Sequence, residues 1–363
     1  MTHYPFKNLV FQGGGMKYLA YLGVIPVLEE VGILPQIERV GGTSAGALLA
    51  AILSFRLSAA ESIAIFRTLD YSKIPGLKTA VRMPSRLLNA NLGKELAHNV
   101  DGFNRLLRHY GWYDTDYAHN WMLETISAQI GYGQATFADF RARGFRDLHV
   151  VATNVSQHRL EIFSADTTPN TAVADALLIS QSMPLFFAAP QFDGRTLGQG
   201  DFYGDGGILA NYPIHLFDAP QYNANHRLNE HSVNWETLGC RLYTPSDCPD
   251  SGRRPVSNLA FYLSNLFETW MEAQTTAYEQ RPMDRQRTIN VSNCCVSTID
   301  FNLRPDPNNE TYQKLLDAGE TAVRQFLDQY TTPDLPDTRP LSEQLRRRID
   351  RFFNFRNRPT IGN

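Results

Sequence analysis

The sequence has no long hydrophobic run. None of its apolar segments approaches about 18 consecutive residues, the length that a membrane-spanning helix needs. The first fifteen residues also lack the basic segment and apolar core that are typical of a Sec signal peptide. We therefore expect a soluble protein, cytoplasmic in the cell that makes it or exported without a Sec signal. If such a protein acts on lipid, it must reach the bilayer from the aqueous side.

An excess of charge of one sign and abundant cysteine are also missing. The formal net charge of the 363 residues is −3, so no overall positive field attracts nucleic acid. The four cysteines are Cys240, Cys248, Cys294 and Cys295, and their spacing fits no zinc site. In a chain of this length they favour free thiols in a reducing compartment over a disulfide scaffold. We expect neither a metal nor a cofactor.

Two glycine-rich turns lie between residues 8 and 54, each between a strand-like and a helix-like apolar run. The second turn, Gly42-Thr43-Ser44-Ala45-Gly46, fits G-x-S-x-G, in which a serine lies on a sharp strand-to-helix turn. Gly42 and Gly46 let backbone and substrate come close. The dipole of the following helix favours an anion that develops at its N-terminus. Ser44 is therefore the predicted nucleophile.

The first turn, Gly13-Gly14-Gly15-Met16-Lys17, opens a helix-like segment that runs to about Val31. Consecutive glycines before a helix present unobstructed backbone N–H groups, which suit an oxyanion. A nucleotide-binding loop is not supported, because G-x-x-x-x-G-K-[ST] is absent and Tyr18 occupies the last position of G-x-G-x-x-G. The predicted oxyanion hole consists of Gly13, Gly14, Gly15 and Met16.

A third motif, Asp205-Gly206-Gly207 followed by Asn211-Tyr212-Pro213, lies far downstream. Together with the two turns it resembles the patatin-like phospholipase family, over about residues 7–216. The resemblance implies a three-layer α/β fold whose central, mostly parallel sheet has helices on both faces. It also implies a Ser44–Asp205 dyad, supported by Gly206 and Gly207, that cleaves fatty-acyl esters of phospholipids or lysophospholipids. Composition and spacing by themselves support only a serine-type acyl hydrolase.

An aspartate can replace histidine as the base only if its pKa is raised, since an unperturbed carboxyl has a pKa near ~3.9. Partial burial raises it, and Asp205 then takes the proton of Ser44. One alternative is that Asp205 is only a turn aspartate. Another is an α/β-hydrolase triad in the chain order Ser-Asp-His, which needs a histidine downstream of Asp205. His215, His226 and His231 are available for that role.

The first motif departs from the family pattern G-G-G-x-[RK]-G, because Tyr18 replaces its last glycine. A bulky residue cannot take a glycine-only backbone angle cheaply, so we expect a differently shaped oxyanion loop. Lys17 matches the basic position, where it either holds the loop or contacts substrate. Tyr18 and the basic tail also prompt a second hypothesis: a protein with a degenerate site that acts by binding lipid or a partner.

The remaining chain carries no further chemical motif. We expect a buried strand at 148–155 that pairs with 160–163, and further strands at 238–243 and 288–291. Helices are expected at 112–130, 172–183, 258–280 and 308–330. The irregular segment 70–111 is interpreted either as a lid beside the site or as an ordinary surface excursion.

The tail differs in composition. Residues 331–336 form a proline-spaced link, after which Leu341, Leu345 and Ile349 share one helical face among several arginines. Such a basic amphipathic helix either lies on an anionic membrane surface or docks on the body of the protein. We therefore divide the chain into a catalytic domain, 1–330, and a linker with a C-terminal helix, 331–363.

Overall fold

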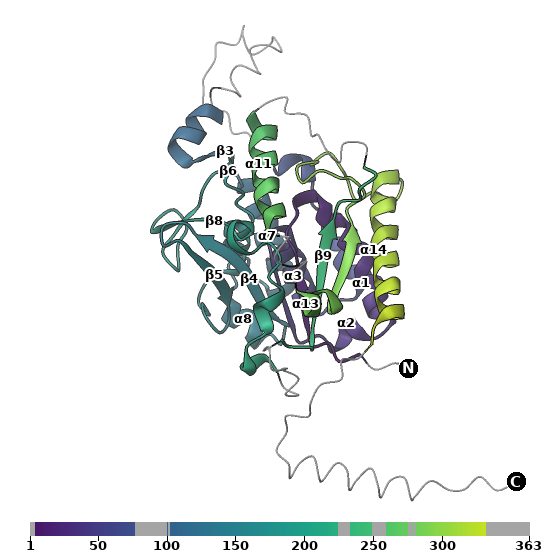
Figure 1. Ribbon diagram of the computed structural model, residues 1–363. Helices are drawn as coiled ribbons and strands as arrows, with labels where there is room; N and C mark the ends of the chain where they lie inside the picture. The colour runs from purple at the N-terminus through teal and green to yellow at the C-terminus, as the bar shows by residue number, and fades with distance from the viewer. Residues whose placement is uncertain are drawn as a thin grey trace, which may run out of the picture.

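The computed structural model describes residues 4–76, 100, 102–223, 233–248, 259–274, 278 and 281–331. The predicted C-terminal helix, most of the 70–111 segment, and the alternative bases His226 and His231 lie outside the described residues. Within the described part the chain forms an eight-stranded sheet, a two-stranded sheet and covering helices (Figure 1).

The central sheet has the order β10-β9-β1-β2-β4-β8-β7, and β5 pairs with β4 outside this path. Neighbours from β10 to β4 are parallel, whereas β5, β7 and β8 run antiparallel to their partners. Its strands are β1 (Asn8–Phe11), β2 (Arg39–Thr43), β4 (Asp147–Asn154), β5 (Arg159–Ser164), β7 (Gln191–Phe192), β8 (Asp201–Asp205), β9 (Thr237–Tyr243) and β10 (Thr288–Ser292). The two-stranded sheet consists of β3 (Gly111–Tyr113) and β6 (Leu185–Phe187).

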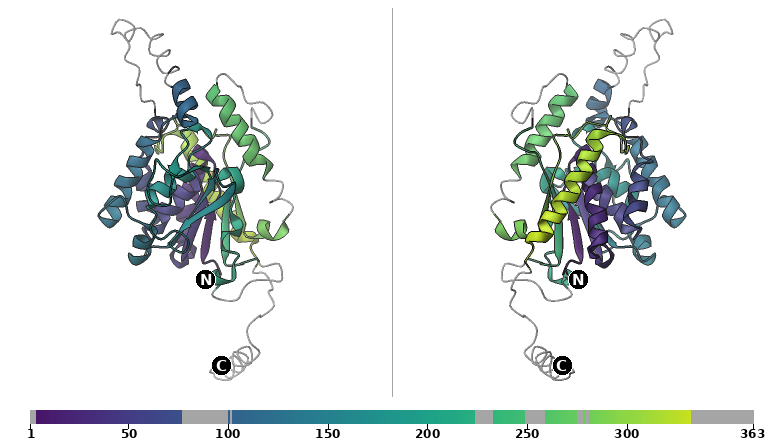
Figure 2. Two further views of the ribbon diagram at one scale, coloured as in Figure 1. Left: turned by 90° about the vertical axis from the view of Figure 1, so that its left-hand side faces the viewer. Right: turned by 90° about the vertical axis from the view of Figure 1, so that its right-hand side faces the viewer.

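Helices cover both faces of the central sheet, which confirms the three-layer prediction (Figure 2). One layer contains α1 (Tyr21–Glu30), α2 (Ile33–Gln36), α3 (Ala45–Ser54), α4 (Ala59–Phe66), α9 (Val173–Ser180) and α14 (Glu310–Gln329). The other contains α10 (Gly207–Ala210), α11 (Leu259–Ala273) and α13 (Pro282–Gln286). The remaining helices are α7 (Asp116–Ile130), α8 (Phe137–Ala142) and the 3₁₀ turns η1 (Gly15–Ala20), η2 (Tyr71–Lys73), η3 (Ile214–Phe217) and η4 (Pro220–Tyr222).

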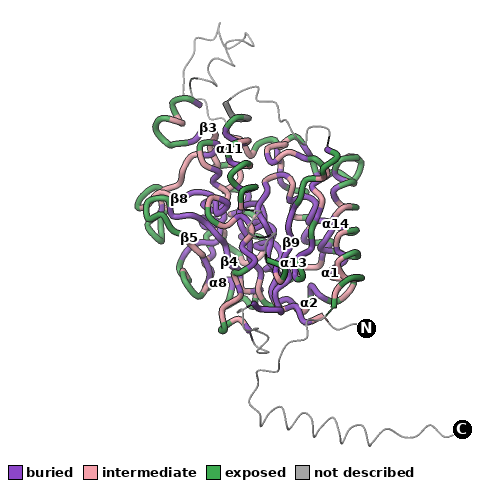
Figure 3. Tube along the Cα trace, viewed as in Figure 1, coloured by how far each residue is buried: buried purple, intermediate pink, exposed green. Residues whose placement is uncertain are grey.

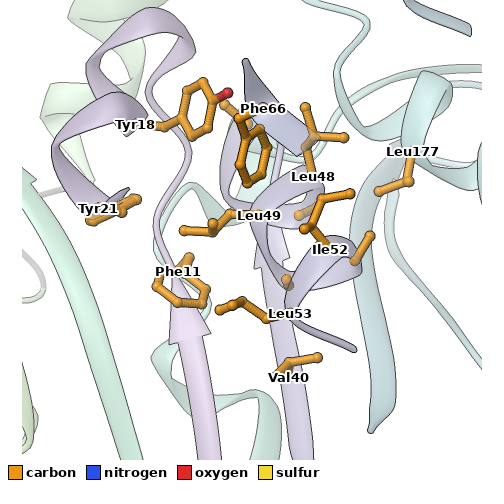
Figure 4. Packing of buried hydrophobic residues seen from close by; sticks show 14 of the residues in the cluster. Phe11, Tyr18, Tyr21, Val40, Leu48, Leu49, Ile52, Leu53, Phe66 and Leu177 are labelled. Carbon is orange, nitrogen blue, oxygen red and sulfur yellow. The ribbon is translucent and has the colours of Figure 1, made fainter. Parts of the chain in front are cut away.

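The core lies around α3, all of whose residues are buried, as its small and apolar composition predicts. Leu49 and Leu53 of α3 lie toward Phe11 of β1, while Ile52 lies on the side of Leu177 of α9 (Figure 4). A helix buried on every side is fixed in position by its neighbours. Its first residue follows the predicted nucleophile directly, so the core also fixes the place of Ser44.

A buried arginine lies at the C-terminal end of α3, the end away from Ser44. Arg146 is 4% exposed and donates hydrogen bonds to the carbonyl oxygens of Leu34, Ile37 and Leu53. Burial lowers the pKa of its guanidinium to about 10. Because carbonyl groups at helix ends lack partners within the helix, one side chain here satisfies groups at the ends of both α2 and α3.

Most expected elements are confirmed, including the 148–155 strand, its antiparallel partner and the strands at 238–243 and 288–291. The expected 112–130 helix begins later, at Asp116, because residues 111–113 pair with β6 instead. A strand partner distant in the sequence decided this boundary. Pro26 lies within α1 without ending the helix.

The prediction of four free thiols is wrong for two of them. Cys248 and Cys295 form a disulfide, whereas Cys240 and Cys294 are free, as expected. The two bonded cysteines are 47 residues apart, but each follows one of two paired parallel strands, β9 and β10. Strand pairing therefore brings together positions whose proximity no sequence spacing indicates.

Candidate active site

Ser44 lies between β2 and α3 with a backbone conformation that L-residues rarely adopt, φ 54° and ψ −128°. Such conformations cost on the order of 1–3 kcal/mol and persist only where the surroundings enforce them. Here the Ser44 N–H donates to Ser180 Oγ at 2.9 Å, and that hydroxyl donates to the Val151 carbonyl at 2.6 Å. No sequence motif identifies Ser180 as the partner of this amide.

The two glycines that flank this turn are required by close packing. A Cβ atom at Gly46 would lie 2.6 Å from the carbonyl oxygen of Gln12, and one at Gly42 would lie 2.6 Å from the carbonyl carbon of Gly46. Both separations are too short for real side chains, and the obstacles are backbone atoms. The G-x-S-x-G spacing therefore allows α3 to start directly against β1 and β2.

Asp205 is the last residue of β8 and is 2% exposed. Its backbone is fixed by hydrogen bonds with Ser182 and Thr153, and its carboxylate Oδ1 accepts the Gly207 N–H at 2.7 Å. Burial raises the pKa of Asp205 to about 7, while hydrogen bonds from the Ser44 side chain and the Gly207 amide act in the opposite direction. The carboxyl is thus poised to exchange a proton near neutral pH.

The sheet order explains why Ser44 and Asp205 meet. Ser44 follows β2 and Asp205 ends β8, and β4 lies between these strands. β8 pairs antiparallel with β4 over residues 203–205. This register places Asp205, the last residue of β8, opposite Ala152 near the end of β4. The Ser44 side chain lies close enough to the Asp205 carboxyl to lower its pKa, against the larger effect of burial. Neither distance along the chain nor composition indicates this contact.

Three histidines of the described chain are engaged elsewhere. His215 contacts the carboxylates of Asp218 and Asp284, His149 contacts Tyr222, and His119 contacts Asp175. Among the described residues no histidine hydrogen-bonds Ser44 or Asp205. His215, the described candidate for a triad base, instead belongs to a cluster around the buried Arg287.

The glycine-rich loop after β1 lies against Ser44, since a Cβ at Gly13 would lie 3.2 Å from the Ser44 Cβ. Two of its four predicted donors are already used: the Gly13 N–H donates to the Asn211 carbonyl at 3.0 Å and the Met16 N–H to the Thr298 carbonyl at 2.9 Å. The Gly14 and Gly15 amides make no hydrogen bond within the described chain. They are the donors that remain available to an oxyanion.

The loop is braced by residues that the motifs do not include. Gly15 has φ +51° and lies against Thr298, whose carbonyl would be 2.2 Å from a Cβ there. Lys17 Nζ lies 3.5 Å from Glu268 Oε1 of α11, and the same oxygen accepts the Thr298 N–H at 3.3 Å. Of the two roles considered for Lys17, the structure supports holding the loop.

Tyr18 has an ordinary backbone angle and points away from the loop. Its ring points into the core, where its edge meets Phe66 with centroids 5.5 Å apart, and its hydroxyl lies 2.5 Å from that of Tyr71 (Figure 4). Its φ is not positive. The position-18 glycine of the family pattern is therefore replaced without strain. One of the two observations behind the degenerate-site hypothesis is removed.

Asn211 and Gln274 connect the segment that follows Asp205 to the end of α11. Gln274 Oε1 accepts the Asn211 N–H at 2.9 Å, and its Nε2 donates to the Gly207 carbonyl at 2.7 Å. The Asn211 side chain is buried beside Gly13 and Gly207, with its Oδ1 unpaired. Asn211 stands in the third motif, whereas no sequence signal identifies Gln274.

Two further properties bear on the chemistry. The described residues contain no cluster of three His, Cys, Asp or Glu side chains that would hold a metal ion. They also contain no helix long and apolar enough to cross a bilayer.

A cavity of about 390 Å³ lies beside β5 and β8, lined by residues such as Glu161, Asp201 and Tyr203, and includes none of the predicted site residues.

Comparisons with known proteins agree with this geometry. The chain is 28% identical to the uncharacterized protein YqhO of Bacillus subtilis over 343 residues, 89% of this chain and 98% of YqhO. It is 26% identical to the cGAMP-activated phospholipase of Pseudomonas aeruginosa over 231 residues, covering 62% of this chain and 61% of that protein. The crystal structure of VipD from Legionella pneumophila shares the fold, with a TM-score of 0.52 and 20% identity over 90% of this chain and 67% of VipD. A sequence model of the family described as patatin-like phospholipase matches residues 9–218. With its two glycine-rich turns and its Asp-Gly-Gly segment inside that match, the chain belongs to the patatin-like phospholipase family.

Proposed function

We propose that this protein hydrolyses fatty-acyl esters with Ser44 as nucleophile and Asp205 as base. The observation that carries the proposal is the closeness of the Ser44 side chain to a buried carboxyl whose pKa is raised to about 7. A carboxyl of that pKa accepts a proton at neutral pH far better than an exposed aspartate does. The N-terminus of α3 at Ser44 adds a favourable dipole for the anion that forms.

The reaction proceeds in two halves. In the first, Asp205 removes the Ser44 hydroxyl proton as the serine oxygen attacks the ester carbonyl, and the amides of Gly14 and Gly15 stabilise the oxyanion. The bond to the alcohol breaks, and the alcohol leaves with the proton from Asp205. In the second half Asp205 removes a proton from water, which attacks the acyl-serine. The fatty acid leaves, and Ser44 regains its proton.

Phospholipids or lysophospholipids are the proposed substrates. Family membership supports a lipid acyl ester, and one relative is named as a phospholipase. The apolar side chains nearest to the site are consistent with an acyl chain: Met271 lies against Gly207, and Met183, Phe186 and Phe187 form one buried cluster with it. We also propose that residues 1–330 act as one catalytic domain, since β9 and β10 complete the central sheet.

Hydrolysis of a short-chain nitrophenyl ester tests the chemistry. Ser44→Ala and Asp205→Ala are each expected to lose activity by at least about a thousandfold, because each removes one member of a coupled pair. Asp201→Asn, on the same strand but only partly buried, is the matched control and is expected to keep activity. Activity that persists in Asp205→Ala would refute the aspartate as base. Mass spectrometry of mixed membrane lipids after incubation then identifies which esters are cleaved.

A further inference from the structure

α11 is the element that contacts most parts of the site from outside the sequence motifs. Its Glu268 holds Lys17 and the Thr298 amide, and Gln274, directly after its end, holds Asn211 and Gly207. Its inner face carries Leu263, Phe267 and Met271, which are buried. Phe267 and Met271 pack with Met183, Phe186 and Phe187 in an apolar cluster separate from the main core.

The outer face of α11 is also apolar. Tyr262, Leu266 and Trp270 are 53%, 49% and 54% exposed, and their spacing of four residues places them along one side of the helix. The exposed residues of α11 include a single charged side chain, Glu272. Figure 3 shows the exposed side of α11 at the upper end of the molecule. We call Tyr262, Leu266 and Trp270 the α11 stripe.

A second apolar row lies at the same end of the molecule. Phe103, Leu107 and Tyr110, on and just after the helical residues 102–109, are all more than half exposed. In Figures 1 and 2 this helix and α11 both project from the end of the molecule opposite the N-terminus. Large apolar side chains gathered at one end of a protein typically mark a binding surface rather than ordinary solvent exposure.

We propose that the α11 stripe docks on the zwitterionic surface of a lipid bilayer, which has no net charge. The inference rests on the proposed function, because a bilayer is where its substrate resides. Tyrosine and tryptophan suit the boundary between headgroups and acyl chains, where one part of the ring is apolar and the other meets water. The stripe has no basic residue and borders the acidic Glu272, so its charge does not match an anionic surface.

The position of the stripe favours a lipid over another protein as the bound partner. On the face of α11 away from the stripe, Glu268 contacts Lys17 of the glycine-rich loop, and exposed Leu209 of α10 lies four residues after Asp205. A lipid held at α11 is therefore next to the apolar cluster and the site. Docking here delivers the acyl ester without full transfer of its apolar chain into water.

Vesicle sedimentation of the full chain tests the proposal, in a Ser44→Ala background so that the lipid remains intact. Vesicles of phosphatidylcholine alone are compared with vesicles that also contain anionic phosphatidylglycerol. Adding Leu266→Glu and Trp270→Glu is expected to reduce partitioning onto phosphatidylcholine vesicles at least tenfold. The matched control adds Val155→Glu and Leu160→Glu, two exposed apolar positions beside the β4–β5 turn, and is expected to bind as its parent does. Thermal unfolding checks that every variant is folded.

Trp270 supplies a second readout. Binding to phosphatidylcholine is expected to shift tryptophan emission to the blue, and Trp270→Phe is expected to remove most of that shift. Unchanged binding of the Leu266→Glu, Trp270→Glu variant would overturn the proposal, as would binding by the parent to anionic vesicles alone. The latter result would point to another surface, such as the basic tail. If the nitrophenyl ester is not cleaved but vesicle binding depends on α11, the docking surface stands and the hydrolase proposal fails.

Discussion

At the scale of single residues, the protonation of Asp205 decides the proposed chemistry. A carboxyl at the end of a buried strand loses hydration, and two hydrogen bonds only partly compensate, so its pKa is raised to about 7. The sequence motif identifies Asp205 as the candidate base, whereas burial sets the pH range in which its carboxylate can accept a proton.

The pH dependence of activity follows directly. Since the base must be ionised, kcat/KM for the short-chain ester is expected to rise with pH and level off above an apparent pKa near 7. The measurement is a pH–rate profile between pH 5 and pH 9, with unfolding monitored at each pH. A limb centred near pH 4 would contradict the role of burial.

The same shift has a cost in stability. In the folded state Asp205 keeps its proton up to a pH of about 7, against 3.8 when unperturbed, so the unfolded state binds fewer protons between these values. The free energy of unfolding therefore falls as pH rises from about 4 to about 7, by up to roughly 4 kcal/mol for a shift of this size.

Asp205→Asn removes this dependence. Its stability relative to the wild type is expected to increase from pH 4 to pH 8, by on the order of 2–4 kcal/mol, as measured by urea unfolding at both pH values. Asp328→Asn, an exposed carboxyl on α14, is the control and is expected to show little change. An equal effect of Asp205→Asn at both pH values would show that the carboxyl is already ionised in the folded protein below pH 4.

At the scale of elements, the arrangement depends on how the ends of helices and strands are satisfied. α3 is apolar except for Ser54 at its C-terminal end, whose hydroxyl donates to the Ala51 carbonyl. Arg146 adds side-chain donors for carbonyls at the ends of α2 and α3 from the turn before β4. An internal arginine that binds only backbone carbonyls is thus part of what holds α3, and with it Ser44, in place.

Arg146→Met tests this role. Methionine keeps the apolar stem but removes one hydrogen-bond donor from each of three carbonyl groups, of which that of Ile37 keeps no other donor within the described chain, and we expect a loss of stability of about 2–4 kcal/mol in urea unfolding. Arg143→Met, at an exposed position three residues earlier, is expected to change stability by less than about 0.5 kcal/mol. Similar results for both variants would mean that water replaces the guanidinium at these carbonyls.

At the scale of the whole molecule, the site is assembled from distant parts of the chain. β1, β2 and β8 bring the three motifs together, while residues 237–298 supply β9, α11, β10 and the Thr298 loop that braces Gly15 and Met16. Cys295 lies three residues before Thr298 and is bonded to Cys248. The disulfide therefore links two cysteines that are 47 residues apart, close along the chain to the Thr298 segment that contacts the glycine-rich loop.

Reduction of this disulfide is expected to destabilise the protein. The chain-entropy model gives about 4 kcal/mol for a loop of this length. We expect a lower unfolding midpoint for the Cys248→Ser, Cys295→Ser variant by calorimetry, and no further change when dithiothreitol is added to it. Cys240→Ser, at a buried free thiol, is the control for cysteine replacement that leaves the disulfide intact. A wild-type midpoint that does not respond to reductant would contradict this expectation.

The sequence by itself determined the family, the two strand–turn–helix units and the identity of Ser44 and Asp205 as candidates, because local spacing and glycine content carry those signals. It also predicted most strands, whose apolar runs are local. Only the tertiary structure decided which amides remain available to an oxyanion, what Lys17 holds and where Tyr18 points. The same holds for the disulfide, the role of Ser180 and the braces from α11. Each of these depends on a partner tens to hundreds of residues away, and such proximity is set by sheet order and packing.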